Sequence, residues 1–403
     1  MYVENVVIKM NKKIMEDFPF LKNEIIYLDN ASTTQKPKQV IEDIKNFYER
    51  GCANVHRGVY KISEDATRLY TLAHEKTAEF INAKSWREII FTKNTTESIN
   101  LISKSLKLKK GDEIILTEME HHSNMVPWMM LEGVRIKYIP VNNNGELEIN
   151  AIEKLITKNT KVISCPHISN FLGTINPVNK IGKIAKKNNI IFVVDAAQSV
   201  PHKKVDVQKM NCDFLVFSSH KMCGPTGIGV LYGKRELLEK MDVFLGGGDM
   251  IESVDFEKFE SCEIPWKFEA GTPNIAGSVG FSAAINYLKN VGLNNIWKHE
   301  QNLVKYALQK MKKMKGVEIY GTKNHKKRCG IISFNIKGID SESVAGIMDS
   351  NNICIRSGHH CAMPMHQKLG IDSSARISFY FYNTKKEIDI FIKKLEEIVD
   401  GLK

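Results

Sequence analysis

Lys221 stands where a short apolar run gives way to polar and glycine-rich residues. The run at 214–217 is followed by Ser218, Ser219 and His220 and, after the lysine, by glycines at 224, 227 and 229. This pattern predicts a buried strand, a tight turn and a second strand at 230–232. A free lysine, with a pKa of about 10.4, is a poor nucleophile. Partly buried beside other cations, it loses its proton more easily and can form a Schiff base with an aldehyde.

A carboxylate at the end of another apolar run indicates which aldehyde. Residues 190–194, IIFVV, predict a buried strand, and Asp195 follows them directly. Pyridoxal phosphate (PLP) is a common aldehyde cofactor, and its lysine normally works with a carboxylate that holds the pyridinium nitrogen. A solvated loop lysine is the alternative, and a lone Ser-His-Lys would favour it. With Asp195 and Gln198 upstream, the sequence favours PLP.

Three motifs carry a resemblance to a known family. VDAAQS (194–199) and SSHKMCGPTGIG (218–229) resemble the class V aminotransferase group of fold-type I PLP enzymes. Cys361 in RSGHHCA (356–362) narrows this to the group II, or Suf-type, cysteine desulfurases, and the resemblance runs from about Ile14 to the C-terminus. Selenocysteine lyase, which would use the same residues, is the alternative. Cys361 argues against an aminotransferase.

The resemblance implies a reaction and its partners. The chain would be a cytoplasmic homodimer that converts L-cysteine, or L-selenocysteine in the alternative, to L-alanine. The sulfur would form a persulfide on Cys361 and pass to an acceptor protein of SufE or SufU type for iron–sulfur cluster assembly. A non-catalytic sulfur carrier is the alternative of another class, and Lys221 and Asp195 argue against it.

The resemblance also implies a role for each site residue. Lys221, Cys361 and His121 are the expected catalytic residues, with His121 stacked on the PLP ring. Asp195 would keep the ring nitrogen protonated, while Gln198 and Asn170 would lie near the phenolic oxygen. The expected phosphate ligands are Thr95, Thr96, Ser218, His220 and, from the partner chain, Thr272. The expected substrate contacts are Arg376, Arg356, Asn170 and His56, and no metal is expected.

Several of these residues also have ordinary interpretations. Thr95 and Thr96 begin a predicted helix after a strand, where free N–H groups suit a phosphate, although a plain helix cap is the alternative. The Arg376 guanidinium suits a substrate carboxylate, and a surface ion pair is its alternative. His56 taken alone is a structural loop residue. His121 and its neighbour His122 lack the partners of a metal site, and one of them can face the site while the other faces away.

Cys361 follows a predicted strand at 353–355 and lies among basic residues. A thiolate is the nucleophilic form of cysteine, and Arg356, His359 and His360 could lower the pKa of the thiol or take its proton. A zinc site is the alternative, with ligands His359, His360, Cys361 and His366. We disfavour zinc because two adjacent histidines rarely converge on one metal.

Strands and helices alternate from about residue 25 to 240. This order predicts an α/β fold of the type I PLP-dependent transferase kind, with a mostly parallel sheet flanked by helices. Ligands in such sheets bind at the carboxyl ends of the strands, where most of the candidate residues fall. We expect a large PLP-binding domain at 25–284 and a smaller α+β domain, formed by 1–24 and 285–403, that carries the cysteine loop.

Composition excludes several other classes. The 403 residues carry a net charge of +11, but the lysines are spread along the chain without an arginine-rich block, so we expect no nucleic-acid partner. The eight cysteines show no CxxC pair, which argues against a zinc module or a disulfide framework. The N-terminus lacks the order of a signal peptide, and no apolar run reaches about 18 residues, so no membrane partner is expected.

Overall fold

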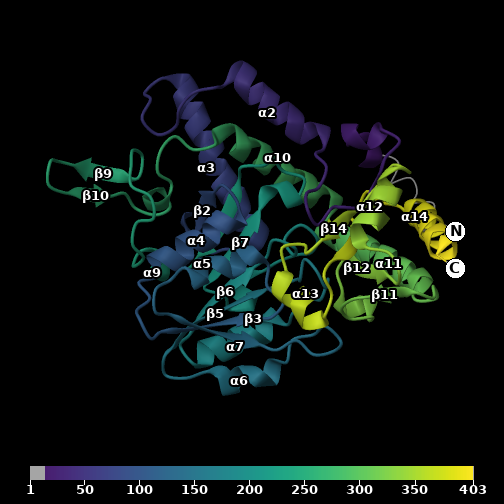
Figure 1. Ribbon diagram of the computed structural model, residues 1–403. Coiled ribbons are helices and arrows are strands. Elements are labelled where there is room, and N and C mark those ends of the chain that lie inside the picture. Colours follow the sequence, from purple (N-terminus) through teal and green to yellow (C-terminus); the bar gives the residue numbers. More distant parts are fainter. Residues whose placement is uncertain (1–13, 403) are drawn as a thin grey trace.

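The computed structural model describes residues 14–402 and contains two main sheets (Figure 1). We predicted a short extension and a helix ending near Pro19 for residues 1–24. Residues 14–16 are helical and the 3-10 helix η1 (Pro19–Lys22) follows, while the earlier part of that prediction lies outside the described residues.

The large sheet has seven strands in the order β2-β8-β7-β6-β5-β3-β4. They are β2 (Ile89–Thr92), β3 (Glu113–Thr117), β4 (Arg135–Ile139), β5 (Thr160–Pro166), β6 (Ile191–Asp195), β7 (Phe214–Ser218) and β8 (Gly229–Gly233). Of these seven, β8 alone runs against its neighbours. The predicted α/β fold with a mostly parallel sheet is confirmed.

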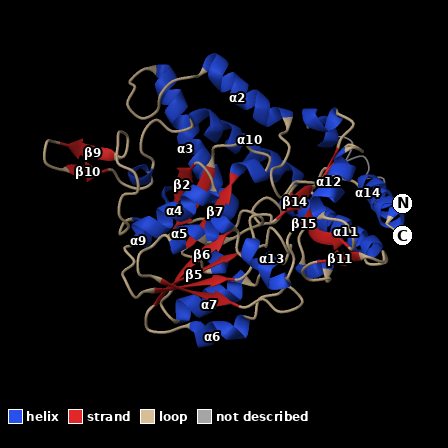
Figure 2. Ribbon diagram, in the orientation of Figure 1, coloured by secondary structure: helices blue, strands red, loops and turns tan. Residues whose placement is uncertain are grey.

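Alternate residues of each strand bury opposite faces of this sheet, since side chains along a strand point to opposite sides. Ile163 and Phe192 enter one core, whereas Val162 and Val193 enter the other. The first face is covered by α3 (Lys61–Ile81), α7 (Val178–Lys187) and α10 (Ile275–Val291). The second is covered by α4 (Thr95–Ser105), α5 (Val126–Met129) and α9 (Arg235–Leu238). Figure 2 shows the strands lying between helices.

The C-terminal part of the chain builds a four-stranded antiparallel sheet. Its order is β11 (Val317–Ile319), β12 (Ile331–Ile336), β15 (Ser374–Ser378) and β14 (Arg356–Gly358). The helices α11 (Leu293–Met311), α12 (Ser341–Asp349) and α14 (Lys385–Gly401) pack on it over a separate hydrophobic core. A capping box formed by Thr384 and Glu387 begins α14.

The first strand belongs spatially with this C-terminal sheet region. β1 (Ile26–Tyr27) pairs in parallel with β13 (Ile353–Cys354), and Leu28 is buried in the C-terminal core. The predicted division into domains, with the limits 25–284 and 285–403 with 1–24, stays a prediction.

The remaining elements include one hairpin that was not foreseen from the sequence. The hairpin of β9 (Ile251–Val254) and β10 (Phe259–Ser261) projects from the body of the molecule (Figure 1). The remaining helices are α2 (Lys38–Arg50), α6 (Ile152–Leu155), α8 (Val207–Met210) and α13 (Met363–Leu369). Over residues 14–402 no helix has both the length and the apolar character needed to cross a bilayer.

Candidate active site

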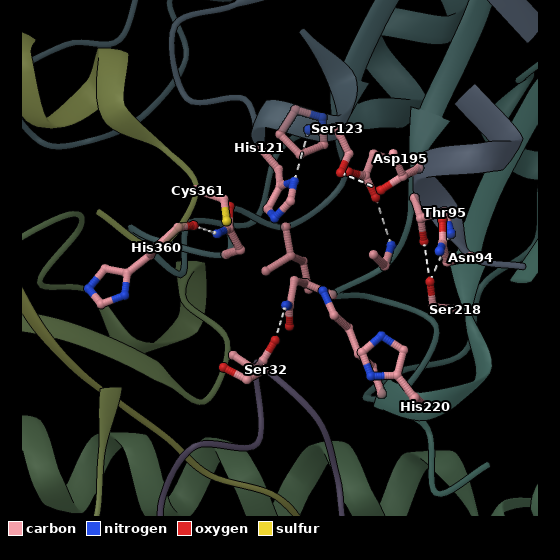
Figure 3. A pocket seen from close by; sticks show the side chains of 18 of the residues that line it. Ser32, Asn94, Thr95, His121, Ser123, Asp195, Ser218, His220, His360 and Cys361 are labelled. Atoms are coloured by element: carbon pink, nitrogen blue, oxygen red, sulfur yellow. Dashed lines mark hydrogen bonds between the residues drawn. The ribbon is translucent and has the colours of Figure 1, made fainter. Parts of the chain in front are cut away.

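The site lies where the parallel strands end. Because β2, β3, β5, β6 and β7 run the same way, the residues that follow them meet at one edge of the sheet. A cavity of about 270 Å³ opens there (Figure 3). Twelve predicted residues line it: Thr95, Thr96, His121, Asn170, Asp195, Gln198, Ser218, His220, Lys221, Arg356, Cys361 and Arg376.

Asp195 ends β6 and is a buried carboxylate, with 6% of its surface exposed. Its Oδ1 accepts a hydrogen bond from the backbone N–H of Ala197 at 2.9 Å. Burial raises the pKa of the Asp195 carboxyl, and the N–H of Ala197 and the charge of Lys221 oppose that rise. A buried carboxylate facing a cavity is poised to bind a cationic group there.

Lys221 lies in the 3-10 helix η5 (Ser219–Lys221), directly after β7. Burial lowers the pKa of Lys221 to about 8, with Asp195 opposing the change and Arg376 adding to it. Two hydrogen bonds from the segment after β1 fix this turn. The carbonyl of His220 accepts the backbone N–H of Thr34 at 3.1 Å and the Lys36 Nζ at 2.9 Å. The cavity therefore contains a fixed lysine that loses its proton near pH 8, far more readily than a free lysine, and a minor fraction of it is already neutral near physiological pH.

His121 follows β3 and takes a defined tautomer. Its Nδ1 accepts the backbone N–H of Ser123 at 3.0 Å, so the neutral ring carries its proton on Nε2. Burial, reinforced by Lys221, lowers the pKa of His121 to about 3. His121 is thus a neutral hydrogen-bond donor, and Figure 3 shows it beside Cys361.

The start of α4 collects hydrogen-bonding groups. The backbone N–H of Thr95 donates to Ser218 Oγ at 2.9 Å, and the two hydroxyls are 2.6 Å apart. The Thr96 hydroxyl lies 2.7 Å from that of Ser123. A Cβ at Gly229 would lie 2.5 Å from the Asn94 Cα, so a glycine is required for β8 to pass this close. Hydroxyls and N–H groups at a helix N-terminus suit an anion such as a phosphate.

Two arginines, Arg356 and Arg376, also line the cavity. Arg376 donates through Nη1 to the carbonyl of Asn170 at 2.9 Å and through Nη2 to Asp29 Oδ1 at 3.1 Å. Both Arg376 and Arg356 donate to Ser32 Oγ, at 3.0 and 2.6 Å. The Nη groups are therefore engaged, and the buried Arg376 Nε has no hydrogen-bond partner among the described residues.

The cysteine loop closes the cavity. Cys361 has a left-handed backbone with φ of 56°, and its carbonyl accepts the backbone N–H of His122 at 2.8 Å. Asn170 Nδ2 donates to the preceding carbonyl, that of His360, at 2.6 Å. The charges of Cys361 and Lys221 interact, so the loop places the sulfur in the electrostatic reach of the lysine.

The family comparisons agree with this geometry. A family model described as aminotransferase class-V matches residues 26–391. The chain belongs to the class V aminotransferase family. A probable cysteine desulfurase of Halalkalibacterium halodurans is 46% identical over 96% of this chain and 97% of that protein.

Two solved structures extend the likeness to three dimensions. The apo structure of a cysteine desulfurase from Thermococcus onnurineus NA1 gives a TM-score of 0.94 at 43% identity, covering 97% of this chain and 98% of that one. The cysteine desulfurase CsdA (S-sulfonic acid) from Escherichia coli gives 0.91 at 34% identity, covering 98% and 99%. The resemblance drawn from the motifs, to class V enzymes and to cysteine desulfurases among them, is confirmed.

Two residues predicted for the site of this class V protein do not line the cavity in a single chain. His56 is exposed, packs 4.3 Å from the Trp266 ring between centroids and lines a second cavity with Arg57 and Asp249. Thr272 is exposed just before α10. Both assignments stay predictions, and Thr272 was placed by sequence on the partner chain's site.

Sequence reasoning missed Ser32 and Lys36. Both follow β1 in the segment DNASTTQK (29–36). A polar turn directly after a predicted strand was the one signal in the sequence that could have pointed to them. Neither residue has a distinctive side-chain type or spacing of its own. Their roles arise from contacts to residues more than 180 positions away in the sequence.

A different group of side chains has metal-ligating geometry. His202, Glu300 and Cys329 are buried in the described part of the chain, with ligand atoms within 4.8 Å of one another. His202 Nδ1 lies 2.8 Å from Glu300 Oε2, so a direct hydrogen bond already joins two of the three. The zinc ligands considered around Cys361 do not form such a group among the described residues. That no metal is bound stays a prediction.

Proposed function

We propose that the protein is a PLP-dependent L-cysteine desulfurase that forms a persulfide on Cys361. The observation that carries the proposal is the joint position of Lys221 and Cys361 in one cavity, beside the two arginines. A lysine suits cofactor chemistry and a thiolate suits sulfur abstraction. Relatives and solved structures that match nearly the whole chain bear the name cysteine desulfurase.

The residues of the cavity fit the cofactor. Asp195 would hold the pyridinium nitrogen, and Lys221 would bind the aldehyde. Donors at the start of α4, at the end of β7 and on η5 would hold the phosphate: Thr95, Thr96, Ser218 and His220. Gln198 Oε1 is buried without a hydrogen-bond partner among the described residues, as expected where a bound group completes the contacts. When bound, PLP supplies an aldehyde and an electron-withdrawing ring that stabilises negative charge at the substrate's Cα.

The other side chains of the cavity bind the substrate and move its proton. Arg376 and Arg356 orient the substrate carboxylate. This carboxylate would accept a hydrogen bond from the Nε–H of Arg376, which has no partner among the described residues. The neutral Lys221 amine removes the Cα proton, and the pKa of about 8 suits that exchange. The Nε2–H of His121 donates a hydrogen bond into the cavity from a ring that burial keeps uncharged.

Cys361 performs the sulfur step. Its thiolate bonds to the substrate sulfur as the substrate's Cβ–S bond breaks. The substrate carbon keeps the electron pair and takes up a proton, so the products are L-alanine and a persulfide on Cys361. The carbonyls of His360 and Cys361 are both hydrogen-bonded, which favours a persulfide that stays in the cavity until an acceptor approaches.

Further parts of the proposal concern partners. The acceptor is a protein of SufE or SufU type, and the sulfur serves iron–sulfur cluster assembly in the cytoplasm. The active unit is a homodimer in which Thr272 reaches the partner's phosphate site. Exposure of Thr272, and of Phe256 at the tip of the β9–β10 hairpin, leaves both available to a second chain.

The test is the reaction itself. PLP-loaded protein is incubated with L-cysteine and a reducing thiol, and alanine and sulfide are measured together. We expect equal amounts of both, and none from Cys361→Ala or Lys221→Ala. L-selenocysteine in a parallel reaction separates the desulfurase from the selenocysteine lyase. Alanine without sulfur release, or pyruvate in its place, would overturn the proposal.

A further inference from the structure

The adjacent histidines 121 and 122 point to different parts of the site. His121 lines the cavity, whereas His122 lies against the loop that carries Cys361 (Figure 3 shows His121 and Cys361). His122 makes two contacts there: its backbone N–H donates to the Cys361 carbonyl at 2.8 Å, and its Nε2 accepts the backbone N–H of Met363 at 3.1 Å. Both contacts lie at the cysteine's carbonyl or just after it, so one residue holds the C-terminal side of the loop.

The loop needs such support because its backbone is strained. His360 and Cys361 have φ of 51° and 56°, in the left-handed region that residues other than glycine rarely occupy. Such a conformation is unfavourable for a residue with a side chain and persists only when the surroundings fix it. The carbonyls of His359 to Ala362 accept bonds from the Ala362 N–H, Asn170, the His122 N–H and His366 respectively. Met363 begins α13, so its N–H has no acceptor within the helix.

We propose that the neutral His122 imidazole is a positioning residue for Cys361, because it accepts the Met363 N–H and fixes the loop at its C-terminal side. The inference rests on the proposed function, in which Cys361 is the nucleophile. His122 acts from a distance of 239 residues in the chain, as the cap of a short helix in the other part of the fold. It touches neither the cofactor nor the reacting sulfur in this role.

The arrangement requires one protonation state. With its proton on Nδ1, neutral His122 offers a lone pair at Nε2; once protonated, it presents an N–H to another N–H and the contact is lost. Three other imidazoles interact with it: His121 on the same segment, His359 on the loop and His366 on α13. Burial, and then His359, lower the pKa of His122, so the neutral acceptor form persists to mild acidity.

Two substitutions distinguish the hydrogen-bond acceptor of His122 from the mere size of its side chain. His122→Phe keeps a ring and the backbone N–H but removes the acceptor. His122→Gln supplies an Oε1 acceptor near the position of Nε2 and cannot titrate. Gln367→Ala, at an exposed position on α13, is the matched control. Amide hydrogen exchange of Met363, expressed as a protection factor, reads the hydrogen bond directly and needs no catalysis.

For His122→Phe we expect Met363 protection and kcat for desulfuration to fall together by about three- to tenfold, with KM for cysteine unchanged. His122→Gln and Gln367→Ala should stay within about twofold of the wild type. Wild-type Met363 protection should stay constant from about pH 8 to about pH 6.5 and fall toward the level of the Phe variant only at lower pH, because the pKa of His122 lies below its ordinary value, while the Gln variant should not change.

Unchanged Met363 protection in His122→Phe would overturn the inference, as would a Gln variant as defective as Phe. These outcomes are distinct from failure of the proposed function. If wild-type protein released no sulfur from cysteine, the function would fall, and the amide protection and the iodoacetamide labelling rate of Cys361 would still report whether His122 fixes the loop.

Discussion

Arg356 and Arg376 stand directly opposite each other on the neighbouring strands β14 and β15, and both donate to the hydroxyl of Ser32. Like charges in this cross-strand position destabilise a sheet unless an anion lies between them. Asp29 contacts Arg376 at 3.1 Å and supplies one negative charge. The second positive charge is available to the carboxylate of a substrate, which explains the placement of two arginines at one end of the cavity.

Arg376→Lys should therefore weaken substrate binding while the cofactor stays bound. The lysine keeps the charge but loses the planar fork, and each hydrogen bond to a charged group contributes about 1.5–3 kcal/mol. We expect kcat/KM for L-cysteine to fall about ten- to a hundredfold, mainly through KM, with PLP absorbance unchanged. Steady-state kinetics decide this. Arg235→Lys, at an exposed ion pair on α9, is the control. Equal kinetic constants for Arg376→Lys and wild type would exclude a role in substrate binding.

Lys221 gives a prediction about pH. Burial lowers the pKa of Lys221 to about 8. Only the neutral amine attacks an aldehyde, so the rate at which cofactor-free protein captures PLP should rise with pH through about 8 and then level off. Stopped-flow absorbance would follow the capture. Lys221→Ala should show no covalent capture at any pH. A rate that still rises steeply above about pH 10, where a free lysine titrates, would contradict the lowered pKa.

The sequence was informative where a strand is followed at once by a polar residue. Asp195 and Lys221 were placed correctly because apolar runs predict buried strands, and parallel strands bring their ends together. The family resemblance then supplied distant residues such as Arg376. The resemblance did not predict that the Nη groups of Arg376 would donate hydrogen bonds to Asp29 and Asn170.

Ser32, Lys36 and the role of His122 could not be predicted in this way. Each depends on a contact between segments whose separation in the sequence is large, and pairing of that kind leaves no local pattern. The β9–β10 hairpin was missed for another reason: its residues 251–261 mix charged and apolar types without the strict alternation of a half-buried strand. Arg356 was assigned to a loop but lies in β14, a strand of three residues.

Metal removal tests the prediction that no metal is bound. A hydrogen bond of 2.8 Å already joins His202 Nδ1 to Glu300 Oε2, so we expect dialysis against EDTA to leave the melting temperature and the activity unchanged. Elemental analysis before and after dialysis is the measurement, and Cys329→Ser is the informative variant. A stoichiometric metal in the wild type that Cys329→Ser fails to retain would instead assign a metal site to His202, Glu300 and Cys329.

The partner-chain role of Thr272 can be tested by mixing subunits. If one site uses Lys221 of one chain and Thr272 of the other, a mixed dimer of Lys221→Ala and Thr272→Ala chains contains one complete site. At limiting PLP, Thr272→Ala dimers should turn over slowly and Lys221→Ala dimers not at all, whereas the mixture should regain activity. Sedimentation must show a dimer under the same conditions. A fully active monomer, or a mixture no better than its parts, would reject the shared site.

Cys361→Ser separates sulfur abstraction from the chemistry at Cα. The serine keeps the size of the side chain and the hydrogen bonds of the loop backbone, because these bonds use the carbonyls of His360 and Cys361 and not the thiol. Cofactor binding and loss of the Cα proton depend on Lys221, so PLP should bind as in the wild type and Cα hydrogen exchange with solvent should continue. Alanine formation from L-cysteine should fall at least about a hundredfold, since a neutral hydroxyl is a far weaker nucleophile than a thiolate. Selenium leaves carbon more readily than sulfur, so some activity on L-selenocysteine should remain.

Mass spectrometry of wild-type protein treated with L-cysteine should find one added sulfur on the peptide that contains Cys361. An added sulfur on Cys223 or Cys354, together with wild-type alanine production by Cys361→Ser, would place the nucleophile elsewhere.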